Sequence, residues 1–245
     1  MPTRSEILAE LGLVPTWRRR AGATIPFADA RADRADVSTP RTASSAEDLR
    51  RIEIRALQWG DLETHIDACR ACGLARTRRR SVPGVGDREA DWLFVGEAPG
   101  ADEDTTGEPF VGQAGKLLDN MLAALGLSRD RCVYIANVLK CRPPSNRTPE
   151  PLEIEACRPY LDRQIALLAP KLVVALGKSA ATTLLNVDAS IASLRGRVHR
   201  YQGVPLIVTY HPAYLLRNLA DKAKAWEDLL LARRTFTAAG GRTAE

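Results

Sequence analysis

Four cysteines have the residue type and spacing of a metal centre. Cys69 and Cys72 form a C-x-x-C pair, and Cys141 and Cys157 are separated by fifteen residues. Four thiolates suit tetrahedral zinc or an iron–sulfur cluster, and the spacing alone does not choose between them, although zinc is the commoner default. The alternative is a set of small buried thiols. The fifth cysteine, Cys132, lies inside the apolar run CVYIANV, so we expect it in the core without a metal.

An arginine run beside the C-x-x-C pair indicates a polyanionic partner. No acidic residue interrupts positions 70–80, which include Arg78, Arg79 and Arg80. A loop fixed by a bound metal could present its guanidinium groups to the phosphates of a nucleic acid, so we predict that this run contacts DNA. The alternative is a solvated basic face, and the formal net charge of +5 is too small to decide.

Alternating apolar runs and helical patterns predict an α/β domain. Runs of strand length occupy 92–96, 132–138, 172–177 and 206–210, and helical patterns occupy 116–125 and 150–169. Such alternation favours a mostly parallel sheet with helices on both faces, whose ligands gather at the carboxyl ends of the strands. The segments GEAPG, KCRPPSNR, GKS and HPAYLL follow the four runs in turn. We interpret GKS as a strand-to-helix turn, because the glycine that a phosphate-binding loop requires is Leu172 here.

The 245 residues fit one core with extensions at both ends. We expect an amphipathic segment over 1–20 that docks on a protein partner, and a linker over 21–45 that is too polar to form a core. The main domain is predicted to span 46–235, with a disordered tail over 236–245. We find no export signal or membrane span, and five cysteines without an export signal favour the reducing cytoplasm. We expect a monomer.

Four longer motifs give the sequence a specific resemblance. They are GEAPGADED (96–104), GEPFVGQAGKLL (107–118), NVLKCRPPSNRTPEP (137–151) and HPAYLL (211–216). With the cysteine quartet, they make the chain resemble family 4 uracil-DNA glycosylases over roughly residues 60–235. The resemblance implies a three-layer α/β/α fold and a structural [4Fe–4S] cluster on Cys69, Cys72, Cys141 and Cys157. It also implies a monofunctional enzyme that hydrolyses the N-glycosidic bond of deoxyuridine in DNA and so initiates base excision repair.

Several motif residues are candidates for binding an extruded uracil. Phe110 matches a family position that stacks on the base, and Gly96 would let backbone approach it closely. The Asn137 carboxamide offers an acceptor for uracil N3–H and a donor for O4, a pattern that opposes cytosine. Ala98 stands where other families of the superfamily have an aspartate, and Asn146 is a further polar position matched in the family. For Asn137 the alternative is a turn or cap.

Catalysis requires stabilisation of the negative charge that develops on the departing uracil. His211 is placed to donate a hydrogen bond to uracil O2. Glu97 and Glu103 are candidates for orienting water, although both could instead cap the following helix. We expect Tyr214 and Leu215, with Leu216, to enter the vacated base stack, the alternative for the leucines being core burial.

Three other functions remain open at this point. A catalytically silent cluster module could bind nucleic acid, but the joint presence of Phe110, Asn137 and His211 argues against it. A covalent trap for uracil-DNA would carry a basic insertion near KCRPP, which this loop lacks. An electron carrier is disfavoured because the cysteines are dispersed through an α/β domain.

Overall fold

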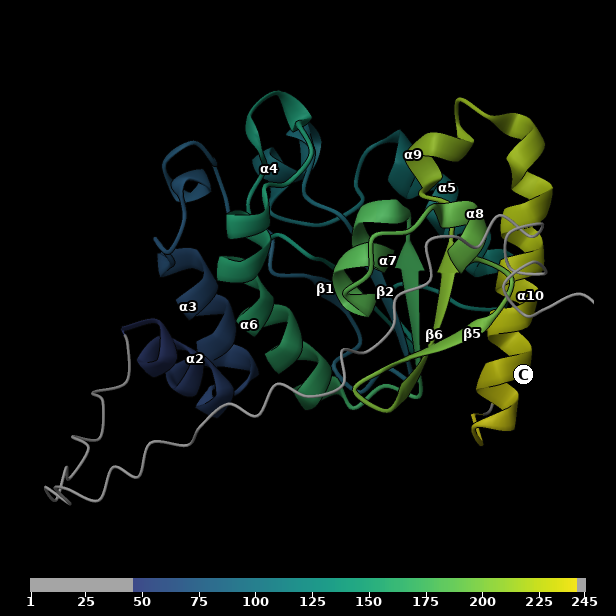
Figure 1. Cartoon of the computed structure of the whole chain (residues 1–245), viewed down its shortest axis with the longest axis horizontal. Helices are drawn as coiled ribbons and strands as arrows, with labels where there is room; N and C mark the ends of the chain where they lie inside the picture. The colour runs from purple at the N-terminus through teal and green to yellow at the C-terminus, as the bar shows by residue number, and fades with distance from the viewer. Residues whose placement is uncertain (1–45, 242–245) are drawn as a thin grey trace, which may run out of the picture. The chain divides into compact units, whose positions relative to one another are not determined.

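A six-stranded sheet forms the centre of the domain (Figure 1). The computed structural model describes residues 46–241. In spatial order the strands are β1 (Val85–Gly86), β3 (Val133–Asn137), β2 (Trp92–Gly96), β4 (Leu172–Leu176), β6 (Val204–Thr209) and β5 (Val198–Tyr201). The four inner strands are parallel, and both edge strands are antiparallel to their neighbours. The predicted apolar runs correspond to the four inner strands, whereas the edge strands were not predicted.

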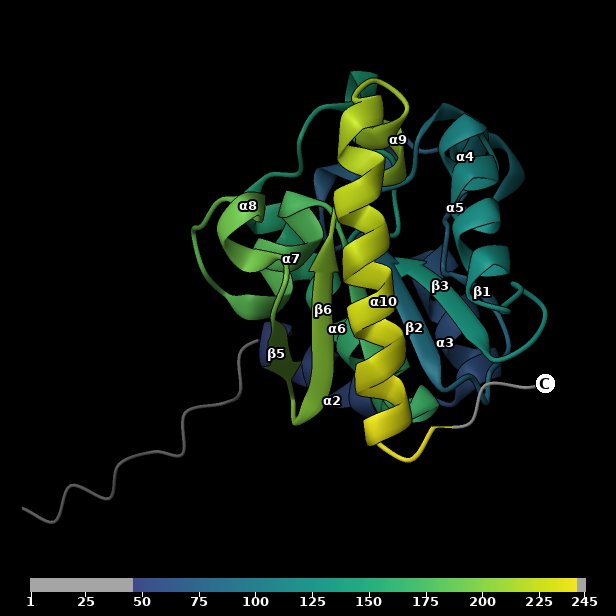
Figure 2. The ribbon, with the colours of Figure 1, turned by 90° about the vertical axis from the view of Figure 1, so that its right-hand side faces the viewer.

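Helices cover both faces of the sheet and confirm the three-layer α/β/α fold. Alternate residues of β2 point to opposite layers, as the period of a strand requires. Leu93 and Val95 pack towards one core, and Trp92 and Phe94 towards the other. Figure 2 shows α10 running along the sheet on one face, with α6 behind it on the other. The helices are α2 (Ala46–Ala56), α3 (Trp59–Ala68), α4 (Ala101–Thr106), α5 (Gln113–Ala124), α6 (Pro151–Leu168), α7 (Lys178–Leu185), α8 (Ile191–Leu194), α9 (Pro212–Leu215) and α10 (Lys222–Ala238), with 3₁₀ turns η1 (Gly73–Arg76), η2 (Pro144–Asn146) and η3 (Leu219–Asp221).

The C-terminal boundary that we predicted at residue 235 is wrong. Helix α10 continues to Ala238, and the Phe236 side chain is buried against Trp92, with ring centroids 4.8 Å apart. Residues 236–241 therefore belong to the domain. The predicted segment and linker over 1–45, and the last four residues, lie outside the described residues. Within the described part of the chain, no helix combines the length and apolar character needed to cross a membrane.

The strand ends bring distant motifs to one edge of the sheet. Strand β2 ends at Gly96, β3 at Asn137 and β6 at Thr209, and all three run in the same direction. The loops that follow carry GEAPG, KCRPP and HPAYLL, so motifs more than a hundred residues apart meet at this edge, where ligands bind in open α/β folds.

Candidate functional site

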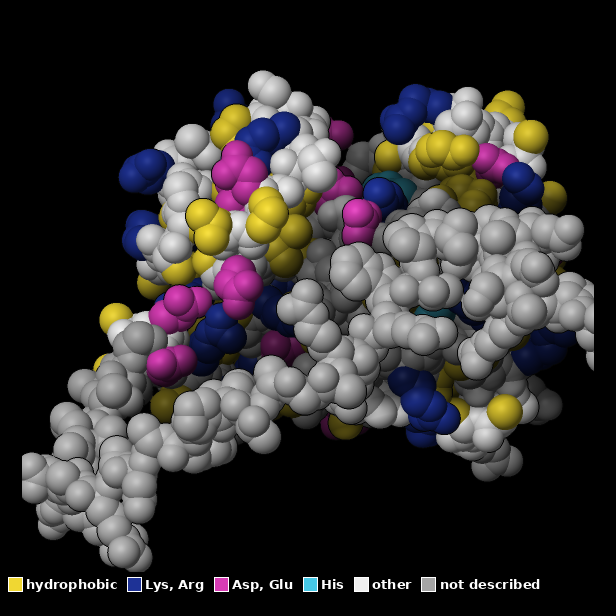
Figure 3. Space-filling model, in the orientation of Figure 1, with side chains coloured by type: hydrophobic (Ala, Val, Ile, Leu, Met, Phe, Trp, Pro, Cys, Tyr) yellow, Lys and Arg dark blue, Asp and Glu magenta, His cyan; other side chains and the backbone are white. Residues whose placement is uncertain are grey.

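A pocket at the carboxyl edge of the sheet gathers most of the predicted catalytic and base-binding residues. Figure 3 shows Lys and Arg side chains on both sides of a hollow on this part of the surface. The lining contains the following predicted residues: Glu97, Ala98, Glu103, Phe110, Asn137, Asn146, His211 and Tyr214.

Asn137 presents an open hydrogen-bond acceptor to this pocket. Its side chain is 2% exposed, and Oδ1 has no hydrogen-bond partner among the described residues. A Cβ on Gly96 would come within 2.3 Å of that oxygen and 2.7 Å of the Phe110 ring. Only glycine at position 96 therefore leaves both groups in place. A buried acceptor without a partner is costly, so the Asn137 oxygen is free to accept a hydrogen bond from a ligand in this pocket.

His211 is held as a neutral imidazole with a defined tautomer. Its Nδ1 accepts a hydrogen bond from the backbone N–H of Ala213 at 3.1 Å, so the ring proton is assigned to Nε2. Burial, and secondarily the positive charge of Arg217, lower the pKa of His211 to about 4. The imidazole stacks on Phe110 with ring centroids 5.4 Å apart. A Cβ on Gly177 would lie 2.9 Å from the His211 Cβ, which explains the glycine of the GKS turn.

The two acidic candidates have different partners. Burial raises the pKa of Glu97, and a hydrogen bond with Ser179 opposes that shift. Glu103 instead accepts backbone N–H groups from Gly100, Val111 and Gly112, at 3.0, 3.1 and 3.4 Å. Glu103 therefore holds the loop that carries Phe110. The Glu97 carboxylate instead hydrogen-bonds a side chain, that of Ser179. Ser179, the last residue of the GKS turn, was interpreted from the sequence as part of that turn and not as a partner of the site.

The loop after β3 borders the pocket on another side. Asn146 is exposed, has a φ of 55°, and accepts a hydrogen bond from Arg142 Nε at 2.8 Å. Arg147 makes a two-pronged contact with Glu153 at 2.6 and 2.9 Å, which ties this loop to α6. Asn146 thus lies at the mouth of the pocket.

Leu215 is not available to contact DNA in this structure. Its side chain is 1% exposed and packs in a cluster with Tyr210 and Ala225, because this position of α9 faces α10 and the core. The next residue, Leu216, is 42% exposed. Tyr214 lines the pocket, stacks on Tyr210 at 5.1 Å and donates its hydroxyl to Asp221 at 2.7 Å.

The four predicted metal-ligating cysteines lie within electrostatic range of one another. Charges on Cys69 and Cys72 act on Cys141, and those on Cys69 and Cys141 act on Cys157. Within the described residues, however, no three His, Cys, Asp or Glu side chains are spaced to hold a single metal ion.

Hydrogen-bond donors surround three of these sulfurs. Arg78 Nη1 donates to Cys141 Sγ at 2.8 Å, and the Lys140 backbone N–H to Cys157 Sγ at 3.2 Å. Cys69 Sγ accepts from the Ala71 N–H at 3.5 Å and from Arg50 at 3.7 Å. Donors of this kind stabilise thiolates. Burial acts in the opposite direction on the inner pair, because it raises the pKa of Cys141 and raises that of Cys157 to about 12, so these thiols are expected to lose their protons when they bind a metal centre.

Arg78 belongs to the cysteine centre and not to a free basic surface. Besides Cys141 Sγ, its guanidinium donates to the backbone carbonyls of Asp67 and Cys69. Because these contacts occupy much of the guanidinium, which is half-buried, DNA contact by Arg78 stays a prediction. Arg79 and Arg80 have exposed side chains, although Arg80 also donates to the Thr106 carbonyl at 3.3 Å.

Lys140 connects the cysteine centre to the pocket. Its ammonium is buried and donates to the Asn137 carbonyl at 2.8 Å and to Gln164 Oε1 at 2.6 Å. Burial lowers the pKa of Lys140 to about 8. The turn that carries Asn137 is thus fixed by a side chain adjacent in sequence to Cys141.

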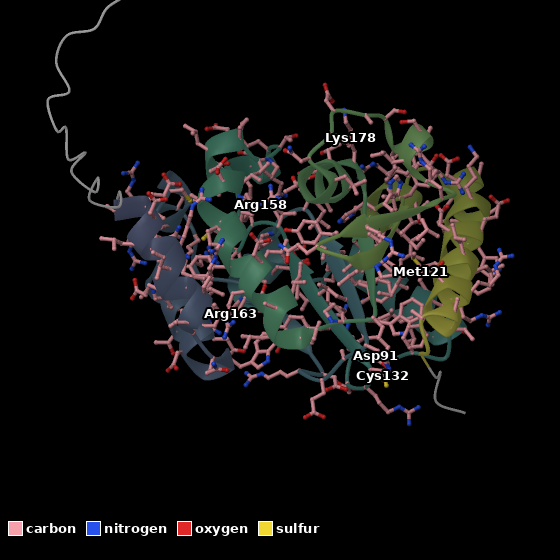
Figure 4. All side chains as sticks on the ribbon, turned by 60° about the horizontal axis from the view of Figure 1, so that its bottom comes forward. Asp91, Met121, Cys132, Arg158, Arg163 and Lys178 are labelled. Carbon is pink, nitrogen blue, oxygen red and sulfur yellow. The ribbon has the colours of Figure 1, made fainter. Side chains whose placement is uncertain are left out.

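Cys132 is separate from the other cysteines. It precedes β3, whereas Cys141 follows that strand, and Figure 4 shows it close to Asp91 at the far edge of the sheet. Its side chain is half-buried and packs against the core, so it lies at the margin of the core in which we expected it.

Comparison with known proteins gives a consistent family. Residues 83–230 match the model of the uracil DNA glycosylase superfamily. The chain is 48% identical to a type-4 uracil-DNA glycosylase of Archaeoglobus fulgidus over 64% of this chain and 82% of the relative. It is 47% identical to the type-4 uracil-DNA glycosylase of Sulfurisphaera tokodaii, over 72% and 86% respectively. A type-5 uracil-DNA glycosylase of Pyrobaculum aerophilum is 38% identical over 57% of this chain and 68% of the relative.

Proposed function

We propose that this chain, which belongs to the type-4 uracil-DNA glycosylases of the uracil DNA glycosylase superfamily, removes uracil from DNA by hydrolysing its N-glycosidic bond. The observation that carries the proposal is the buried, unpartnered Oδ1 of Asn137 in the same pocket as a neutral His211. The simplest test is incubation with an oligonucleotide containing one uracil, followed by alkali. Cleavage at that position, and none in matched thymine or cytosine oligonucleotides, supports the proposal. An uncut uracil strand contradicts it.

Asn137 and Phe110 select the base. Uracil N3–H donates to Asn137 Oδ1, and the amide Nδ2 donates to uracil O4. Cytosine presents a donor in place of O4 and an acceptor in place of N3–H, so both contacts become repulsive. The Phe110 ring provides the stacking face for a base that has left the helix.

His211 stabilises the leaving group. As the glycosidic bond breaks, negative charge develops on the base, and the Nε2–H of His211 donates to O2. A neutral donor suits this task because its proton stays on the histidine throughout. We assign orientation of the attacking water to Glu97, since Glu103 already accepts three backbone N–H groups.

The cysteine centre is proposed to hold a [4Fe–4S] cluster with a structural role. The four cysteines come from separate segments of the chain and interact electrostatically, and thiolates are the protein ligands of iron–sulfur clusters. When bound, the cluster would cross-link the Cys69–Cys72 segment, the loop after β3 and α6. Lys140 and Arg78 place positive charge beside these sulfurs.

A matched pair of cysteine variants tests the cluster. Anaerobically purified protein should contain iron and sulfide and absorb broadly at about 400 nm, as thiolate-bound clusters do. Cys157→Ser should lose this absorbance, whereas Cys132→Ser should retain it because Cys132 lies at the other end of β3. Stoichiometric zinc without iron, or loss of absorbance on changing Cys132 alone, would refute the assignment.

DNA is proposed to lie across the pocket mouth, with Leu216 as the residue that enters the vacated stack. Arg79 and Arg80 supply exposed positive charge, and Arg217 lines the mouth of the pocket. We expect the Arg79→Ala/Arg80→Ala double variant to weaken DNA binding for any sequence and to reduce the slope of log K against log [salt] by about 2, roughly one per phosphate contact.

Two variants control this measurement. Arg233→Ala/Arg234→Ala removes two exposed arginines from the far half of α10 and should leave the slope unchanged. Arg78→Ala should instead reduce absorbance of the cysteine centre. An unchanged slope in the Arg79/Arg80 variant would mean that these side chains only face solvent.

A further inference from the structure

Phe110 adopts a backbone conformation that its residue type disfavours. Its φ is 55°, in the left-handed region, although it is neither glycine nor asparagine. Its side chain is only 6% exposed, and its ring lies against His211. Such a conformation persists only where the surroundings impose it. The contacts of this peptide therefore decide where the stacking ring lies.

One guanidinium holds the carbonyl side of this peptide. Arg129, in the loop between α5 and β3, donates Nη1 to the Pro109 carbonyl at 2.9 Å and Nη2 to the Phe110 carbonyl at 2.5 Å. Its Nε is paired with Asp119 of α5 at 2.5 Å. The Arg129 side chain is 20% exposed and does not line the pocket. A planar fork with five donors can satisfy three acceptors at once, which an ammonium cannot do with the same geometry.

The N–H side of the same peptide bond has its own partners. Glu103 accepts the N–H groups of Val111 and Gly112. Helix α5 also approaches closely, because a Cβ at Gly115 would lie 1.7 Å from the Phe110 carbonyl oxygen. The strained peptide is thus fixed between a carboxylate, a helix and the Arg129 guanidinium.

We propose that Arg129 is a positioning residue for uracil excision, acting through the Phe110 backbone to keep the aromatic ring stacked beside His211. The inference rests on the proposed function. It assigns Arg129 no contact with DNA or the base, so its loss affects the chemical step and not the binding of phosphates. When the two hydrogen bonds from Arg129 to the Pro109 and Phe110 carbonyls are lost, Phe110 relaxes towards a negative φ. Its ring then moves away from the wall of the pocket.

A readout independent of activity tests this placement. The chain has three histidines, so ¹³C-labelled imidazole signals are few, and the ring current of Phe110 marks His211. We expect Phe110→Ala to shift the His211 signal and Arg129→Gln to shift it in the same direction. Arg129→Lys should not restore it. A His211 signal that keeps its parent position in Arg129→Gln would overturn the proposal, whether or not the enzyme is active.

Kinetics provide the second readout, through a double-mutant cycle. Arg129→Gln should lower the single-turnover excision rate by about tenfold or more, since small displacements of a substrate-positioning group are costly. In a Phe110→Ala background the same change should alter the rate less than about twofold, because the group through which it acts is gone. An equal loss in both backgrounds would show a general structural effect and refute the proposal.

Arg163 offers a matched control. It is a partly buried arginine on α6 whose Nε donates to the Leu57 carbonyl at 2.6 Å. Figure 4 shows it beside the helices, and it does not line the pocket. Arg163→Gln should leave both the His211 signal and the excision rate at parent values. If the parent itself released no uracil, the proposed function would fail, while the His211 signal would still decide the role of Arg129.

Discussion

His211→Ala is expected to reduce the single-turnover rate of uracil excision by a factor on the order of 10² or more while leaving the affinity for uracil-containing DNA nearly unchanged. The side chain donates a hydrogen bond that strengthens as charge develops on the leaving base, so its removal acts on the transition state. His199→Ala is the control, because that imidazole bonds the Leu194 carbonyl beside β5, away from the pocket. A parent rate in His211→Ala, or a loss of affinity as large as the loss of rate, would show that the residue is structural.

The pH dependence follows from the same group. Because the pKa of His211 is lowered to about 4, the neutral donor persists from pH 8 down to about 5, and its protonation should reduce excision only near pH 4. An ordinary histidine would titrate near 6.5. As pH falls, the unfolded chain takes up this proton near pH 6.5 and the folded chain only near pH 4. The contribution of His211 to the free energy of unfolding is therefore complete above pH 6.5 and declines as pH falls from 6.5 towards 4. An acid limb near 6.5 that disappears in His211→Ala would contradict a neutral imidazole.

Asn137→Asp is expected to lower uracil excision by roughly 10²-fold and to create slow excision of cytosine. The carboxylate opposes uracil O4, and in its protonated form offers cytosine a better match of donors and acceptors. The effect should be large because the group is buried and Oδ1 has no other partner. Rates are compared on oligonucleotides that differ only in uracil or cytosine.

The exposed Asn120 on α5 provides a matched substitution. Asn120→Asp makes the same chemical change outside the uracil pocket and should preserve both rates. An unchanged ratio of uracil to cytosine excision in Asn137→Asp would mean that the amide does not identify the base.

The sequence predicts the position of a site residue well when that residue lies at the end of a strand. The four inner strands are continuous apolar runs, so residues at or just after their carboxyl ends, such as Asn137 and His211, meet at one edge of the sheet. The edge strands escape prediction because β1 has two residues and β5 is largely exposed, so neither has an apolar pattern.

Side-chain partners are harder to predict because they depend on packing between distant segments. Arg78 binds a sulfur 63 positions away, and nothing in the arginine run distinguishes it from its neighbours. Leu215 and Leu216 are chemically equivalent, and only the packing of α9 against α5 and α10 decides which is buried. Arg129 shows no motif at all, since its role follows from two carbonyls on a loop nearly twenty residues earlier.

Mass spectrometry of the reaction mixture tests the central claim most directly. A uracil-containing oligonucleotide is incubated with the full-length protein, and the intact masses of DNA and protein are measured without alkali. Hydrolysis by this pocket predicts DNA that has lost one uracil and gained one water, free uracil in equal amount, an unbroken strand and an unmodified protein. Intact substrate, a cleaved strand, or a protein that has gained the mass of the DNA would contradict a monofunctional, hydrolytic uracil-DNA glycosylase.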